Sequence, residues 1–116
     1  MYKRTLDNIP SQEIPAGKGA SMQMLISPDE APHFAMRKFV IKAGGHMPFH
    51  TNTVEHEQYV LKGKAKVKVG NEEFIAQKDD ILFIPQGIPH SYYVEGDEDY
   101  EFLCLVPKKE DKIELL

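Results

Sequence analysis

The sequence has one cysteine, no apolar run long enough to span a membrane and no excess of basic residues. The single Cys104 excludes an internal disulfide bond and fits a reducing cytoplasm best. A membrane-spanning helix needs about 20 mostly apolar residues in a row. The first ten residues also lack the apolar segment of a signal peptide. We therefore expect a cytoplasmic protein with no membrane partner.

The charge balance argues against a nucleic-acid partner. The chain carries 14 Lys and Arg against 18 Asp and Glu, which gives a net charge of −4. Nucleic-acid-binding domains instead concentrate basic charge on one surface. Lysine occurs at every second position from Lys62 to Lys68, and that period is typical of a β-strand with one face in solvent. We expect no nucleic-acid partner.

Short apolar or alternating segments recur between turn-forming residues, and none has a helical period. The predicted strands are Met22–Ile26, Phe34–Lys42, Phe49–Asn52, His56–Leu61, Lys64–Val69, Glu72–Ala76, Ile81–Ile84, His90–Val94 and Tyr100–Val106. Many short strands at even spacing predict an all-β protein, an antiparallel sandwich or barrel of the jelly-roll type. A chain of 116 residues is long enough for one such domain.

The two ends of the chain depart from this pattern. Residues 1–33 hold several turn formers and only one predicted strand, and we interpret residues 1–20 as an arm that could cross to a neighbouring subunit. Because open sheet edges need cover, we predict a homodimer. Residues 34–106 form the predicted barrel. Residues 107–116 are a charged tail, which we expect to be a frayed end or a short helical turn.

Most of the histidines lie in or just before two short segments. His50 and His56 belong to the segment 44–63, His90 follows a Pro-Gln-Gly-Ile-Pro sequence, and His46 lies just before His50. Neutral imidazole is the commonest protein ligand for divalent transition metals. Because strand side chains alternate, His50 shares a face with Asn52. By the same rule His56 shares a face with Gln58, and His90 with Tyr92. Three imidazoles that converge inside a barrel would bind a metal and leave positions open.

These two segments resemble the motifs of the cupin superfamily. The first cupin motif is Gly-x5-His-x-His-x3,4-Glu-x6-Gly, and here Gly44, His50 and Gly63 match it. Asn52 stands where the second histidine is usual, and His56 where the glutamate is usual.

The second cupin motif is Gly-x5-Pro-x-Gly-x2-His-x3-Asn. Pro85, Gly87 and His90 match it, whereas Asp79 replaces the opening glycine and Val94 the closing asparagine.

The resemblance implies a double-stranded β-helix, the cupin jelly-roll barrel, and a divalent metal. Histidine at position 56 resembles the small cupins that hold manganese with four histidines. With Asn52 in place of one histidine, that fourth position would fall to the Asn52 amide or to a water. The resulting site of His50, His56 and His90 would suit manganese, iron, nickel or zinc. The alternative is a metal-free pocket in which these residues are polar lining.

Other residues near the motifs are candidates for the pocket. Gln58 could bond a ligand or a metal-bound water, and Tyr92 could donate a proton or form a wall. Phe102 and Cys104 share one face of a strand, and Cys104 also fits a small buried filler. Arg37 would contact an anionic substrate if its face points inward.

The predicted inward positions offer no obvious acid–base pair. Sugar isomerisation and epimerisation need a positioned proton shuttle, so the pattern favours a small-molecule oxidoreductase of the dioxygenase type. The rival hypothesis is a non-enzymatic cupin that binds or senses a small molecule or a metal, and the sequence leaves open whether the protein is an enzyme.

Overall fold

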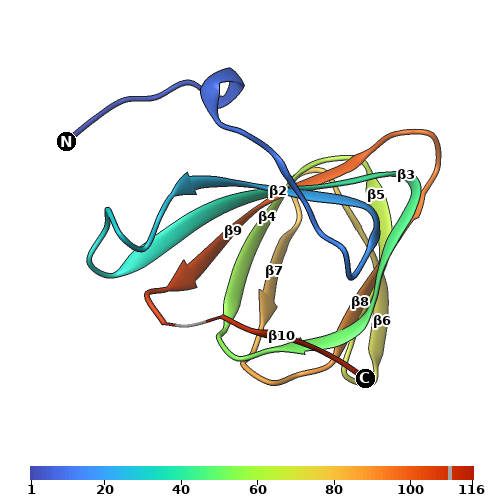
Figure 1. Ribbon diagram of the computed structural model, residues 1–116. Helices are drawn as coiled ribbons and strands as arrows, with labels where there is room; N and C mark the ends of the chain where they lie inside the picture. Colours follow the sequence, from blue (N-terminus) through green and yellow to red (C-terminus); the bar gives the residue numbers. More distant parts are fainter. Residues whose placement is uncertain (110) are drawn as a thin grey trace.

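The computed structural model describes residues 1–109 and 111–116, and it folds them into a strongly curled, mainly antiparallel β-sheet (Figure 1). The described strands are β1 (Gln12–Glu13), β2 (Lys18–Ile26), β3 (Phe34–Asn52), β4 (His56–Lys62), β5 (Lys64–Val69), β6 (Glu72–Gln77), β7 (Ile81–Ile84), β8 (His90–Glu95), β9 (Tyr100–Pro107) and β10 (Ile113–Leu115). A short 3₁₀ helix, η1, spans Leu6–Asn8. The all-β jelly-roll prediction is confirmed. Within the described residues no helix has the length and apolar character needed to cross a membrane.

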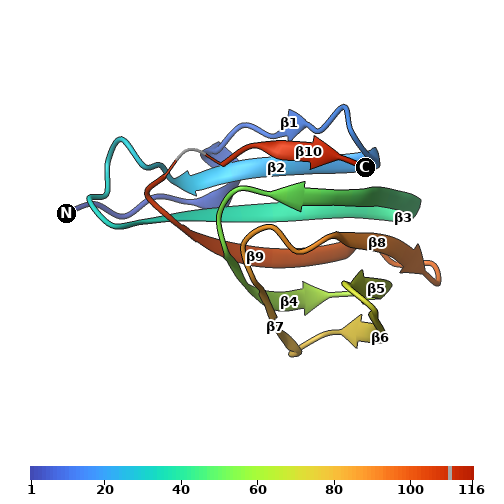
Figure 2. The ribbon, with the colours of Figure 1, turned by 90° about the horizontal axis from the view of Figure 1, so that it is seen from below.

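Strand β3 is the centre of this sheet. The strand order is β6-β5-β8-β3-β9-β4-β7, while β2 and β10 also pair with β3, and β1 pairs with β2. Figure 2 shows β1, β2 and β10 beside β3 on one side of the barrel, with β4 to β7 on the opposite side. The sequence predicts two separate strands here, but β3 continues through Gly44 and Gly45. Gly44 has a φ of 80°, which glycine adopts without strain, so the strand bends there and does not end.

Alternating burial places the site residues inside the barrel. On β5 the side chains of Ala65 and Val67 are fully buried, while the lysines that alternate with them face solvent. On β4 the buried positions are His56, Gln58 and Val60. Side chains that are two residues apart on a strand point the same way. The polar site residues therefore share the inner face with the apolar core.

The chain ends are part of the same sheet. β1 pairs with β2 of its own chain, with Gln12 opposite Met22, and the predicted homodimer remains a prediction. The tail forms β10, with Ile113 opposite Asn52 and Leu115 opposite His50. A frayed end or a helical turn was the wrong interpretation of this segment, because Ile113 and Leu115 alternate with polar residues in the manner of a strand. The tail thus lies beside the part of β3 that carries two site residues.

Candidate metal site

A cavity of about 120 Å³ lies inside the barrel, next to β3. It is lined by Ile14, Met22, Arg37, Phe39, Met47, His50, Asn52, His56, Gln58, His90, Tyr92, Phe102 and Ile113. All of the site residues predicted from the sequence except Cys104 are in this lining. Cys104 is fully buried behind it, with its Sγ 3.7 Å from Arg37 Nη2. The arm and the tail each add one apolar residue, Ile14 and Ile113.

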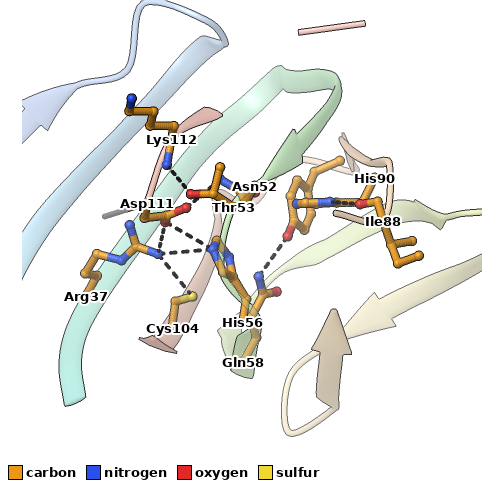
Figure 3. Close-up of polar contacts among 11 residues, drawn as sticks. Arg37, Asn52, Thr53, His56, Gln58, Ile88, His90, Cys104, Asp111 and Lys112 are labelled. Carbon is orange, nitrogen blue, oxygen red and sulfur yellow. Dashed lines mark hydrogen bonds and ion pairs between the residues drawn. The ribbon is translucent and has the colours of Figure 1, made fainter. Parts of the chain in front are cut away.

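His50 and His90 face each other across neighbouring strands. They are paired in the β3–β8 register, and their ring centroids are 4.2 Å apart. His50 Nδ1 donates to the carbonyl of Pro48 at 2.8 Å. His90 Nδ1 donates to the carbonyl of Ile88 at 2.9 Å, as Figure 3 shows. A neutral imidazole with its proton on Nδ1 has an acceptor lone pair on Nε2. Both rings therefore have Nε2 available as a ligand atom.

Burial keeps these two rings neutral. It is the main cause that lowers the pKa of His90 to about 4, and the nearby His50 lowers it further. Burial also lowers the pKa of His50, against the hydrogen bond to Pro48, which raises it. Metal binding requires deprotonated imidazole nitrogen. At neutral pH both residues are already in the form that binds a metal.

His56 is held differently. Its Nε2 lies 3.2 Å from Asp111 Oδ2 and 3.4 Å from Arg37 Nη2 (Figure 3). Burial lowers the pKa of His56, but hydrogen bonds with Asp111 and Cys104 outweigh it and raise the pKa to about 9. At neutral pH His56 is an imidazolium that donates from Nε2 to the Asp111 carboxylate. In this state its Nε2 has no lone pair for a metal.

Asp111 contacts three of the candidate site residues, and the sequence reasoning missed it. Besides His56, its carboxylate accepts from Arg37 Nη2 at 3.1 Å and from Asn52 Nδ2 at 3.3 Å. Burial raises the pKa of Asp111, but the contacts with His56 and Arg37 reverse this and hold it below its usual range. The sequence signal that could have found Asp111 was the alternation of Ile113 and Leu115, which indicates a strand directly after it.

Gln58 and Tyr92 form a polar pair in an aromatic wall. Gln58 Nε2 donates to the Tyr92 hydroxyl at 2.8 Å. The Tyr92 ring stacks on Phe102 at 5.4 Å, and Phe102 stacks on Phe39 at 5.1 Å. Burial raises the pKa of Tyr92 well above its usual value, so the phenol remains protonated. Tyr92 can donate a hydrogen bond but does not act as a phenolate. His46 is outside the lining and stacks on Tyr93 at 5.0 Å.

Residues 37–106 match the cupin domain family. The chain belongs to the cupin family. Among solved structures, this cupin is similar to the polyketide cyclase RemF from Streptomyces resistomycificus. That likeness has a TM-score of 0.88 and 25% identity, and it covers 100% of this chain and 86% of that one.

Two further relatives extend the comparison. A predicted oxalate decarboxylase from Thermotoga maritima has a TM-score of 0.77 at 23% identity, and each chain is covered in full, which shows the shared fold. A 1-methylthio-D-xylulose 5-phosphate methylsulfurylase from Rhodospirillum rubrum is 30% identical over 80 residues, which are 69% of this chain and 51% of that protein. The second curated relative is an uncharacterised protein from Methanocaldococcus jannaschii, of which the match covers 57%. The chain therefore spans little more than half the length of the curated relatives that it matches.

The cavity of this cupin contains acceptor atoms that lack a partner. Asn52 Oδ1 and Gln58 Oε1 are buried and accept no hydrogen bond from any residue that the structure describes. Both side chains line the same cavity as His50 and His90. Two imidazole nitrogens and amide oxygens are a donor set that fits a divalent first-row metal. Among residues 1–109 and 111–116, no group of three or more His, Cys, Asp or Glu already has metal-site spacing. His56 can join the set once its Nε2 leaves Asp111.

Proposed function

We propose that this cupin is a metal-dependent enzyme that oxidises a small molecule with dioxygen. The observation that supports this most is the anchoring of His50 and His90 through Nδ1, beside the unpartnered Asn52 Oδ1. Such outer hydrogen bonds orient metal-ligating histidines in general. His56 would complete a three-histidine set, with Asn52 or a water at a fourth position. Manganese, iron, nickel and zinc suit these donors, and a bound redox-active metal would supply the centre that activates dioxygen.

The chain's own residues would position the substrate. The wall of Phe39, Tyr92 and Phe102 packs against apolar parts of a ligand, and the Tyr92 hydroxyl donates a hydrogen bond. Gln58 holds that hydroxyl in place.

Proton transfer at a carbonyl compound is the second candidate. The sequence reasoning disfavoured it because no acid–base pair was found, but the structure brings Asp111 and His56 together beside the cavity. A histidine next to a carboxylate is a common general acid–base arrangement. The likeness to a polyketide cyclase agrees with this candidate, since polyketides carry many carbonyl groups.

Metal analysis tests the first part of the proposal. The protein is purified without added metal and its metal content is measured by mass spectrometry, for the wild type and for the variants His50→Gln, His90→Gln and His46→Gln. We expect about one metal ion per chain in the wild type, loss of metal in the first two variants and no loss in the third, because His46 is outside the cavity. A wild type that binds no metal even from a supplied excess would overturn the proposal.

Two assays on the same sample then separate the reactions. Oxygen uptake is measured with small diols, diketones and thiols, and deuterium incorporation from heavy water is followed by NMR with the same compounds. Uptake supports the oxidative function. Deuterium incorporation without uptake supports proton transfer by His56 and Asp111. A tightly bound metal with neither signal supports a binding or sensing module.

A further inference from the structure

The guanidinium group of Arg37 is a buried cation in the wall of the cavity. Its side chain is 11% exposed, and the residue lies on β3 opposite Cys104. Nη2 contacts Asp111 Oδ2 at 3.1 Å, whereas the buried Nε has no hydrogen-bond partner among residues 1–109 and 111–116. Nε and Nη2 form an edge of the guanidinium that can hold both oxygens of a carboxylate. Asp111 uses only the Nη2 end of this edge.

Among the residues that the structure describes, the side chains in polar contact with the Asp111 carboxylate all line the cavity. Its carboxylate touches Arg37, His56 and Asn52, each at 3.1 to 3.3 Å. Figure 3 shows the Asp111 side chain directed at Arg37 and His56. A carboxylate therefore already lies where a ligand in the cavity would meet these three side chains.

Asp111 is carried by the tail and not by the barrel. β10, directly after it, has three residues and pairs with the end of β3. The backbone nitrogen of Lys112 donates to Thr53 Oγ1 at 2.8 Å, which holds the tail through contacts independent of the Asp111 side chain. Because Asp111 lies outside every strand, its side chain can move without breaking a hydrogen bond between barrel strands.

We infer that Arg37 binds the carboxylate group of a small ligand, and that Asp111 takes the place of this group while no ligand is bound. The inference rests on the proposed function only in taking the cavity as the ligand site. A cavity of about 120 Å³ fits a molecule of a few heavy atoms. The planar edge of Arg37 matches a carboxylate better than a tetrahedral phosphate.

Calorimetric binding to the metal-free protein tests this inference. The probes are pyruvate and acetate, with methyl pyruvate as a neutral match and inorganic phosphate as a different anion. Asp111→Asn removes the competing charge, and we expect pyruvate Kd to fall about fivefold, since the competent fraction of the protein rises. Arg37→Lys keeps the charge but loses the planar edge, and we expect Kd to rise about tenfold or more.

Glu114→Gln is the matched control, because it removes one negative charge from the exposed side of the same tail strand. We expect its Kd for pyruvate to equal that of the wild type. Circular dichroism and the thermal midpoint confirm that each variant is folded. Should Arg37→Lys fail to fold, Asp111→Asn and the neutral ester still decide the outcome.

Four results would overturn the inference: no carboxylate binding to Asp111→Asn, unchanged or weaker binding in that variant, equal binding of methyl pyruvate, or tighter binding of phosphate. Since no metal is present in this experiment, its failure leaves the metal and oxygen-uptake results untouched. Absence of oxygen uptake, in turn, does not affect the binding measurements.

Discussion

Asp111 Oδ2 lies 3.2 Å from His56 Nε2, although the two residues are 55 positions apart in the chain. His56 belongs to the first cupin motif and Asp111 to the tail. Their side chains are only 7% and 12% exposed, so water screens the interaction weakly. The protonation state of His56 therefore depends on where the tail lies.

Removal of the Asp111 charge should lower the pKa of His56. In the metal-free wild type the pKa is about 9. Asp111→Asn removes the strongest of the contacts that raise it, while burial and Arg37 still lower it and Cys104 still raises it. We expect the pKa to fall clearly below 9, toward the ordinary histidine value of about 6.5. Titration of the His56 ring protons by NMR measures this, and a pKa that stays near 9 would contradict the described ion pair.

The same pair should make stability depend on pH. His56 has a higher pKa in the folded state than in the unfolded state, so its contribution is complete below about pH 6.5 and is lost as the pH rises through 9. The difference in free energy of unfolding between wild type and Asp111→Asn should therefore shrink by on the order of 2 kcal/mol over that interval. Urea denaturation of both metal-free proteins at pH 6 and pH 10 measures it. A constant difference would contradict the prediction.

The barrel and much of the cavity could be predicted because both depend on local patterns. The alternation of side chains along β4 places His56 and Gln58 on one face, independently of the tertiary structure. Both residues line the cavity. The predicted strands Lys64–Val69 and Glu72–Ala76 likewise appear as β5 and β6, which pair with Val69 opposite Glu72.

The contacts of Asp111 could not be predicted in this way. They require β10 to pair with the far end of β3, and such a pairing depends on the complete sheet. The continuity of β3 escaped prediction for a related reason. Gly44 and Gly45 are typical turn residues, but here neighbouring strands pair on both sides of the bend and keep the chain extended.

Replacement of Asn52 by histidine should increase metal occupancy. Within the described part of the chain, Asn52 Oδ1 is buried beside the histidines with no hydrogen bond. Imidazole is a stronger donor than an amide oxygen for a first-row metal. We expect Asn52→His, purified without added metal, to retain markedly more metal than the wild type. Elemental analysis of both proteins measures it.

Asn71→His is the control for this experiment, because Asn71 is exposed in the β5–β6 hairpin and adds a histidine away from the cavity. Equal occupancy in wild type and Asn52→His would place residue 52 outside the coordination sphere. An equal increase in both variants would mean that any added histidine captures metal.

Gly63→Ala should destabilise the barrel more than Gly44→Ala. Both glycines have positive φ, 82° and 80°, which costs about 1 kcal/mol or more for alanine. At Gly63 a Cβ would also collide with the backbone carbonyl of Asp99, whereas at Gly44 it would meet nothing within 4 Å. We expect a clearly larger drop in thermal midpoint for Gly63→Ala. Equal drops would show that the backbone near Asp99 relaxes without cost.

The thiol of Cys104 should not react in the folded protein. Cys104 has no exposed surface, and its Sγ contacts the Arg37 guanidinium at 3.7 Å. A thiol reagent reaches such a group only after local or global opening, so the rate should follow the opening equilibrium. We expect one thiol per chain to react at once in denaturant, and reaction in buffer to be slower by orders of magnitude. Because β9 pairs with β3 and β4 on either side of Cys104, release of β10 alone should not expose it. After correction for differences in global stability, the thiol of Asp111→Asn should thus react as slowly as that of the wild type. Fast reaction in that variant would contradict the prediction and show that the tail protects the barrel interior as well as the cavity.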